Sequence, residues 1–303
     1  VPNSESSWSK SHPTERRTLA SKTKTLAVEN YDLGATLSSG QAFRWQPLGQ
    51  AWEGVIGDRW VRLHLAKRGI TAEAPFPTND WAWLEKYLDT RFDLGQAIST
   101  FPEDEPMQNA VAALPGLRLL RQDYWECLAS FILSATKQIV QIQQMVALLA
   151  ERYGKPIASG GDSPAFAFPT IERIAACSEA ELRDCKLGFR APNLLGAARD
   201  ILDGNIAWQQ LPEMTSADAR GELMKLRGVG QKIADCVLLF AGGHQEVFPV
   251  DVWIERALQR LFFPKRKPSA KRLRHFADTH FGPHAGLAQQ YLFHYARVHL
   301  KLK

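Results

Sequence analysis

The stretch 226–251 constrains this chain more than any other part of its sequence. It reads LRGVGQKIADCVLLFAGGHQEVFPVD, and Gly228 and Gly230 lack a Cβ atom, so the backbone there can take positive φ angles and approach another molecule closely. The following pattern predicts a helix over about 231–241, whose first N–H groups have no partner inside the helix. Such a helix start can bind an anion, and a DNA phosphate fits. A Gly-x-Gly turn is also ordinary punctuation between two helices, so both interpretations stay open here.

Lys232 lies in the first turn of this predicted helix, where the positive end of the helix dipole disfavours a cation. The dipole contributes only about 0.3–1 kcal/mol, so a reactive lysine also needs burial in a cleft. A deprotonated lysine is a nucleophile that can form a Schiff base with an aldehyde-like carbon. The alternative is an ordinary lysine at the solvated surface, which is the commonest setting of this residue.

Two further side chains of the stretch have a structural and a chemical interpretation. Asp251 precedes a helical pattern and can therefore cap that helix, and a capping carboxylate that faces Lys232 can also stabilise a positive charge that develops on a sugar. Cys236 follows Lys232 by four residues and shares its helix face. Its thiol either packs in the core or offers a soft surface to an aromatic base.

The chain divides into a polar tail and two segments with different hydrophobic patterns. Residues 1–26 are rich in Ser, Thr and Lys and predict a flexible tail. Residues 27–105 are β-rich, and residues 106–303 carry helical periodicity to the end. The sequence therefore predicts an α+β protein, with a small N-terminal antiparallel β-sheet domain followed by an all-helical domain.

The clearest strand evidence follows a Gly-Asp turn at 57–58. Val61, Leu63 and Leu65 alternate with the residues between them, which predicts an antiparallel sheet with one buried face. Upstream, Gly40 interrupts the strand-like run LSSGQAFRW. A glycine inside a strand pattern marks a bulge, or a place where the backbone approaches a ligand closely.

Charge is distributed unevenly over the chain. The whole chain carries only +5, but residues 264–303 hold nine Lys or Arg against one acidic residue. A basic end on a slightly acidic body suits a polyanionic partner such as a nucleic acid. The alternative is a basic face that only contacts solvent.

The cysteines and the apolar runs limit the class of protein. The four cysteines form no CxxC pair, so the sequence supports neither a zinc ribbon nor a cysteine-ligated iron–sulfur cluster, and no metal site is predicted. Sparse cysteines in apolar surroundings fit a reducing compartment. The chain shows no signal peptide, and no apolar run approaches the length of about 18 residues that spans a membrane. We therefore expect an intracellular protein without membrane contact.

Together these residues resemble the helix-hairpin-helix DNA glycosylase superfamily, and specifically the 8-oxoguanine DNA glycosylase family. LRGVGQK is followed, nineteen residues after its lysine, by the Asp of FPVD. The resemblance extends to SGQAFRW at 39–45, ECLASFILS at 126–134, LGFRA at 187–191 and AQQYLF at 288–293, and so covers nearly everything after the tail. It implies a monomer that acts on double-stranded DNA containing damaged guanine. No cofactor is implied for the chemistry, and the hairpin has room for a structural cation.

The resemblance also implies roles for individual residues. It makes Lys232 the nucleophile and Asp251 the catalytic carboxylate. The backbone carbonyl of Gly40 would accept the N7–H that 8-oxoguanine has and guanine lacks. Cys236 and Phe293 would sandwich the extruded base. The remaining substrate contacts would come from Gln289, which reads the Watson–Crick edge of the base, and from Trp253, near the phosphate of the lesion.

For the rest of the DNA, the resemblance implies an aromatic wedge at Phe189. The adjacent Arg190 stands where the family has an arginine that contacts the orphaned partner base. The hairpin and one basic side chain complete the predicted DNA contacts, namely Gly228, Val229, Gly230 and Lys137.

The chain departs from its eukaryotic relatives at several positions. An Asn run and an Arg one turn on, which read the estranged cytosine, are replaced by TKQ at 136–138 and by Gln141. Trp253 replaces a His, and Arg227 replaces the usual Pro of the hairpin. We therefore expect relaxed discrimination for cytosine and a divergent, bacterial branch of the family. Its location would be the bacterial cytoplasm or nucleoid, or the nucleus in a eukaryote.

Two alternatives remain open. One is a glycosylase for other damaged purines, alkylated or formamidopyrimidine, that uses Asp251 with water and no covalent step; the presence of Lys232 argues against it. The other is a non-catalytic helix-hairpin-helix module that only grips DNA phosphates. Such a module has no reason to bring Lys232, Asp251 and the Gly40 segment together.

Overall fold

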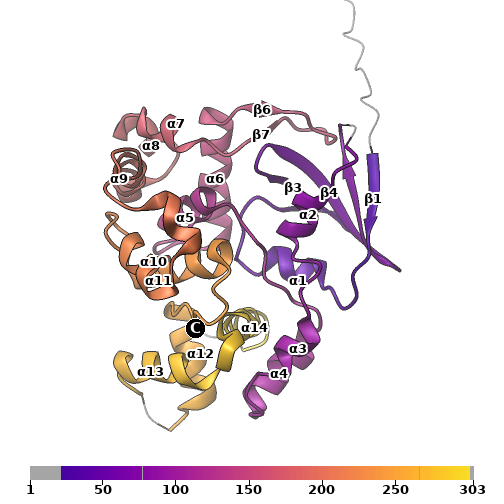
Figure 1. The fold of residues 1–303 in the computed structure, drawn as a ribbon, viewed down its shortest axis with the longest axis vertical. Coiled ribbons are helices and arrows are strands. Elements are labelled where there is room, and N and C mark those ends of the chain that lie inside the picture. Colours follow the sequence, from indigo (N-terminus) through magenta and orange to yellow (C-terminus); the bar gives the residue numbers. More distant parts are fainter. Residues whose placement is uncertain (1–21, 77, 266, 301–303) are drawn as a thin grey trace, which may run out of the picture.

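Five antiparallel strands form the N-terminal sheet of the computed structural model, which describes residues 22–76, 78–265 and 267–300 (Figure 1). Their spatial order is β1-β5-β4-β3-β2. The predicted turn at 57–58 joins two neighbouring strands and brings Val55 opposite Trp60. The strands are β1 (Lys22–Leu26), β2 (Gln46–Leu48), β3 (Ala51–Ile56), β4 (Arg59–Ala66) and β5 (Gly69–Ala74).

The rest of the described chain is mainly helical, so the predicted α+β class is confirmed. A short second sheet, β6 (Pro156–Ile157) with β7 (Ala165–Phe166), interrupts the helices. The helices are α1 (Leu33–Ser38), α2 (Ala82–Tyr87), α3 (Leu94–Ile98), α4 (Glu105–Ala113), α5 (Tyr124–Leu133), α6 (Ile139–Tyr153), α7 (Ile171–Ala175), α8 (Glu179–Asp184), α9 (Ala191–Leu202), α10 (Ser216–Leu223), α11 (Gln231–Val237), α12 (Val252–Phe262), α13 (Ala270–His280) and α14 (Ala285–Val298).

The predicted tail is too long at its C-terminal end. Residues 1–21 lie outside the described part of the chain, but Lys22–Leu26 form strand β1, which pairs antiparallel with β5. Only Leu26 of this strand is buried, with 3% of its surface exposed. An edge strand with only one buried side chain can have the same polar composition as a flexible tail. The composition of β1 therefore predicted a tail and not a strand.

The expectation of a single buried face on β4 is wrong. Val61 and Leu63 are fully buried, but Leu65 is 57% exposed, whereas Trp60 on the opposite face is only 4% exposed. Trp60 packs with Val55 and with Ala165 of β7. Figure 1 shows the β6–β7 hairpin beside β3 and β4. A loop from the helical part of the chain therefore covers the second face of the sheet, which the alternation alone did not indicate.

The helix ends follow local sequence signals. A capping box starts α8, because Ser178 Oγ accepts from Glu181 N at 3.2 Å and Glu181 Oε2 accepts from Ser178 N at 2.7 Å. Thr215 caps α10, because its Oγ1 accepts from Asp218 N at 3.2 Å. The helix predicted to end near Ala241 continues from α11 through a π-helical turn, Leu238–Gly242.

Helix α14 connects the last part of the chain with the first. It packs against α12 and against α4, and Gln290 on it donates from Nε2 to Ser39 O at 3.0 Å. Gln122 Nε2 donates to the neighbouring Gln41 O at 2.6 Å. The first bond holds the backbone beside Gly40 against α14, and the second holds it against the segment before α5. Together they set one wall of the cavity described next.

Candidate active site

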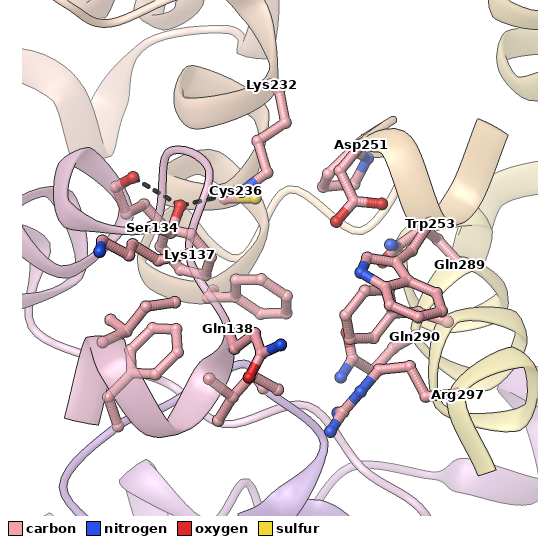
Figure 2. Close-up of a pocket in the computed structure, with 18 of the residues that line it drawn as sticks. Ser134, Lys137, Gln138, Lys232, Cys236, Asp251, Trp253, Gln289, Gln290 and Arg297 are labelled. Carbon is pink, nitrogen blue, oxygen red and sulfur yellow. Dashed lines mark hydrogen bonds between the residues drawn. The ribbon is translucent and has the colours of Figure 1, made fainter. Parts of the chain in front are cut away.

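A cavity of about 360 Å³ opens between the loop after α1, the α5–α6 connection, and helices α11, α12 and α14 (Figure 2). This volume lies within the range of about 300–1,000 Å³ that small-molecule sites occupy. All predicted catalytic and substrate-binding residues, and one predicted DNA contact, line it: Gly40, Lys137, Lys232, Cys236, Asp251, Trp253, Gln289 and Phe293.

Lys232 enters the cavity from the start of α11, directly after the hairpin. Its Nζ donates to Ser134 Oγ at 3.2 Å and lies 5.0 Å from the ring centroid of Phe131. The side chain is half-buried. One hydrogen bond and one cation–π contact therefore hold the amine at the cavity wall instead of leaving it free in solvent.

Asp251 faces the cavity from the N-terminus of α12, on the side opposite Lys232 (Figure 2). The predicted cap is confirmed, because Asp251 Oδ1 accepts from Ile254 N at 2.8 Å. This bond involves Oδ1, and Figure 2 shows the carboxylate directed into the space between α11 and α12. The helix cap thus sets the orientation of the carboxylate in the cavity.

Cys236 and Gly40 line two further parts of the cavity. Cys236 is 3% exposed, and burial raises the pKa of its thiol to about 12, so the group is neutral. Gly40 has φ +81°, and a Cβ atom there would lie 2.6 Å from Ile139 Cδ1 and 3.4 Å from Phe293 Cε1. Glycine suits this position, because the positive φ strains other residues and a Cβ atom would require the Ile139 side chain to shift.

Gln289 presents an unused hydrogen-bonding group to the cavity. The residue is 5% exposed, and its Oε1 has no hydrogen-bond partner among the described residues. Buried polar groups are normally paired, and a lone acceptor in a cavity wall indicates a donor on the molecule that binds there.

Ser134 and Arg297 are two polar residues among the cavity-lining residues that sequence reasoning missed. Ser134 lies in the segment ECLASFILS, but nothing in its position indicated the bond to Lys232, which comes from a helix 98 residues further on. Arg297 lines the cavity near Asp251, and its guanidinium lies 5.5 Å from the ring centroid of Phe293. Burial lowers the pKa of Arg297, and Asp251 acts in the opposite direction. Its spacing of four residues from Phe293 was the available signal.

Phe189, the predicted wedge, is exposed, whereas the adjacent Arg190 is buried. Phe189, in the short helical turn Gly188–Arg190, is 58% exposed, as a side chain that enters a DNA stack must be. Arg190 is only 3% exposed, and its guanidinium donates to the carbonyl of Ala135 and to Thr136 Oγ1. In this structure the guanidinium of Arg190 therefore bonds to the protein itself, and its contact with the orphaned base stays a prediction.

The hairpin between α10 and α11 has the predicted geometry at one of its glycines. Gly228 has φ +79°, whereas Gly230 caps α11 at φ −94°. Val229 is 5% exposed, and its N–H donates to Leu226 O at 3.1 Å. The Val229 side chain thus belongs to the core, and its N–H is already paired within the hairpin.

Replacement of Gly228 by alanine is expected to destabilise the protein, because the new Cβ would lie 2.4–2.9 Å from side-chain atoms of Asn193 at a positive φ. We expect the free energy of unfolding in urea to fall by about 1–3 kcal/mol. Gly230→Ala is the matched control: its Cβ meets nothing within 4 Å, so stability should stay within about 0.5 kcal/mol. If Gly230 faces a phosphate, this control should still bind duplex DNA more weakly. Equal stabilities of the two variants would contradict the assignment.

The described residues contain neither a cluster of metal ligands nor a helix that could span a membrane. Within residues 22–76, 78–265 and 267–300, no group of three or more His, Cys, Asp or Glu could hold a metal ion. In the same ranges no helix is long and apolar enough to cross a membrane.

Two family matches divide the chain. Residues 25–128 match the 8-oxoguanine DNA glycosylase N-terminal domain, and residues 129–281 match the HhH-GPD superfamily of base-excision DNA repair proteins. The junction lies within the segment ECLASFILS, 126–134, which ends at Ser134.

Relatives cover nearly the whole chain. A probable N-glycosylase/DNA lyase of Methanothermobacter thermautotrophicus is 29% identical over 90% of this chain and 95% of its own length. The structure of a protein named MBOgg1 with a low-affinity DNA ligand is 33% identical, with a TM-score of 0.85, over 94% of this chain and 97% of that one. The Clostridium acetobutylicum 8-oxoguanine glycosylase/lyase, in complex with double-stranded DNA containing cytosine opposite 8-oxoguanine, is 30% identical with a TM-score of 0.84, over 89% of this chain and 93% of that one. The chain therefore belongs to the 8-oxoguanine DNA glycosylase family, within the helix-hairpin-helix superfamily of base-excision repair proteins.

Proposed function

We propose that this protein excises 8-oxoguanine from double-stranded DNA and then cleaves the strand at the abasic site, as a bifunctional glycosylase and lyase. The observation that carries the proposal is one cavity in which Lys232 and Asp251, on facing helices, meet the side-chain-free backbone of Gly40. The DNA-bound relative from Clostridium supports the same substrate. A monomer suffices, since the described chain supplies every proposed catalytic group. The protein would act in the compartment that contains the DNA of the cell.

Recognition of the base follows from the walls of the cavity. The target base must leave the DNA stack, at a cost of a few kcal/mol, and the exposed Phe189 would fill the gap. The Gly40 carbonyl would accept a hydrogen bond from N7–H of 8-oxoguanine. N7 of guanine is itself an acceptor, so its lone pair would repel the carbonyl oxygen. Cys236 and Phe293 would contact the two faces of the base, and the unpaired Gln289 Oε1 would accept N–H groups of its Watson–Crick edge.

The proposed chemistry starts at Lys232. Bound DNA would close the cleft around the amine, which is the nucleophile of the proposed reaction. Nζ attacks C1′ of the sugar, the electron pair of the glycosidic bond leaves with the base, and Asp251 stabilises the positive charge on the sugar. Loss of the amine proton and opening of the sugar ring then produce a Schiff base. Removal of a C2′ proton expels the 3′ phosphate, and hydrolysis of the Schiff base frees Lys232. A cation at the hairpin would only bridge backbone carbonyls and a phosphate.

The test uses the wild-type protein on three duplexes, which contain 8-oxoguanine, guanine or an alkylated purine, with and without borohydride. We expect free 8-oxoguanine, strand cleavage and a borohydride-trapped covalent adduct on the first duplex only. Base release from the alkylated duplex without an adduct would favour a glycosylase that uses water. Binding without base release would favour a non-catalytic DNA-binding module.

We further propose that the base opposite the lesion is read weakly. Two of the side chains that replace the cytosine-reading residues already make hydrogen bonds within the protein: Gln141 Oε1 accepts from Gln138 N at 3.2 Å, and Thr136 Oγ1 accepts from Arg190. One good bidentate contact to a base contributes about 1–3 kcal/mol of discrimination, and without such contacts that discrimination is lost.

Single-turnover excision rates opposite cytosine, adenine, guanine and thymine are therefore expected to lie within about 10-fold of one another, a spread of roughly 1.4 kcal/mol. Identical flanking sequences serve as the control for duplex stability. A preference for cytosine above about 100-fold would show that other residues supply the missing contacts.

A further inference from the structure

Each of the three guanidinium nitrogens of Arg190 has a hydrogen-bond partner inside the protein. The residue is 3% exposed. Its Nε donates to Ala135 O at 2.9 Å, Nη1 donates to Leu187 O at 3.3 Å, and Nη2 donates to Ala135 O and to Thr136 Oγ1, the latter at 2.9 Å. A buried charge with a partner at each nitrogen is costly to withdraw, because the withdrawal leaves carbonyl groups unpaired.

The backbone that Arg190 holds is strained. Thr136 has φ +56°, a left-handed conformation that is a genuine outlier for a β-branched residue. Such a conformation persists only where the surroundings impose it. The bonds from Arg190 to Thr136 Oγ1 and to the carbonyl just before Thr136 are contacts of this kind. Lys137 N also donates to Ser134 O at 3.2 Å and closes the turn 134–137.

This turn leads directly to the proposed nucleophile. Ser134, its first residue, accepts from Lys232 Nζ at 3.2 Å. At the other end, the Arg190 guanidinium carbon lies 4.1 Å from the ring centroid of the exposed Phe189. An unbroken series of contacts therefore runs from Phe189 through Arg190 and the turn 134–137 to Lys232.

We propose that Arg190 is a positioning residue, which holds the turn 134–137 in its strained form, places Ser134 to bind Lys232 and braces Phe189 as a wedge. We expect it to contribute little to reading the base opposite the lesion, because four of its five N–H donors are already used inside the protein. This inference rests on the proposed function for its kinetic consequences. Its structural part, the restraint of the turn, stands independently.

The experiment compares Arg190→Gln and Arg190→Lys with the wild type. In Arg190→Gln we expect single-turnover adduct formation on 8-oxoguanine duplexes to slow by about 10–100-fold. The ratio of rates opposite cytosine and adenine should change by less than about 2-fold, since no base contact is lost. Arg190→Lys keeps the charge but only part of the hydrogen bonding, and should lie between the two. A rate like the wild type, or a change above about 5-fold in the cytosine-to-adenine ratio, would overturn the proposal.

Two further variants act on the other end of the same bond. Thr136→Val removes Oγ1 and keeps the shape, so it should slow adduct formation several-fold without changing the opposite-base ratio. Thr136→Gly, combined with Arg190→Gln, should restore part of the rate, because glycine takes φ +56° without strain. No rescue, together with a normal rate in Thr136→Val, would show that the turn does not depend on Arg190. Thr136→Val also serves as the test if Arg190→Gln does not fold.

Hydrogen exchange separates this inference from the proposed function. The amides of the turn 134–137 should exchange faster in Arg190→Gln than in the wild type, while those of α9 and α14 stay unchanged. Absence of a wild-type adduct would defeat the proposed lyase activity alone. Unchanged exchange in the turn would defeat the positioning role, whatever the wild-type activity is.

Discussion

Lys232→Gln is expected to abolish the borohydride-trapped adduct on an 8-oxoguanine duplex and to slow strand cleavage by at least about 1,000-fold. Glutamine has a comparable length and can still donate to Ser134 Oγ, the partner of Lys232 Nζ at 3.2 Å, so the wall of the cavity should stay intact. What glutamine lacks is an amine that can form a Schiff base. The measurement is single-turnover trapping followed by denaturing gel electrophoresis.

Lys137→Gln is the matched control, because Lys137 also lines the cavity but does not bond to Ser134 Oγ. Its removal takes away one cation near DNA, so affinity should fall and become less sensitive to salt. At saturating protein the adduct should still form. A full adduct in Lys232→Gln would show that Lys232 is not the nucleophile. Loss of the adduct in Lys137→Gln alone would place the nucleophile in the α5–α6 connection.

Asp251→Asn is expected to slow adduct formation by about 100–1,000-fold with almost no loss of stability. The two parts of this result have different causes. An asparagine oxygen can still accept from Ile254 N, which Asp251 Oδ1 now does at 2.8 Å, so the cap of α12 survives. The negative charge that faces the proposed cationic sugar disappears. Affinity for an intact duplex should be unchanged or slightly higher, because one charge repelled by the phosphates is gone.

Asp251→Ala distinguishes the two roles further. It loses both the cap and the charge, so we expect the slow rate of the asparagine variant together with a fall of about 1 kcal/mol in the free energy of unfolding. Urea unfolding of the three proteins measures the stability part. If Asp251→Asn reacted like the wild type, the carboxylate would be a helix cap and nothing more.

The sequence allowed the main features of the site to be predicted because several of its signals are short-range. A glycine at φ +79° in the hairpin and a carboxylate cap at Asp251 depend on residues within one or two turns. The set of cavity residues came from the resemblance of scattered motifs to one family, and the structure does bring all of them to one cavity. The roles assigned to those residues remain proposals that the variants above test.

The errors have a common origin in packing. Strand β1 was taken for part of a tail because only Leu26 of its five residues is buried. The burial of Trp60 depends on a loop near Ala165, about one hundred residues away, that covers this face of the sheet. The burial of Arg190 depends on carbonyl groups more than fifty residues earlier in the chain. Contacts between residues this far apart in the sequence produce no periodic pattern that could have predicted them.

The sequence by itself determined the fold class, the hairpin and the chemical groups of the stretch 226–251, because turns, caps and helix periodicity arise between neighbouring residues. Only the tertiary structure decided which groups meet. Gln290 reaches Ser39 across 251 residues of sequence, and Lys232 reaches Ser134 across 98. Such contacts form when separate helices bury their apolar faces against one another, and that packing sets the distance between a nucleophile and its support.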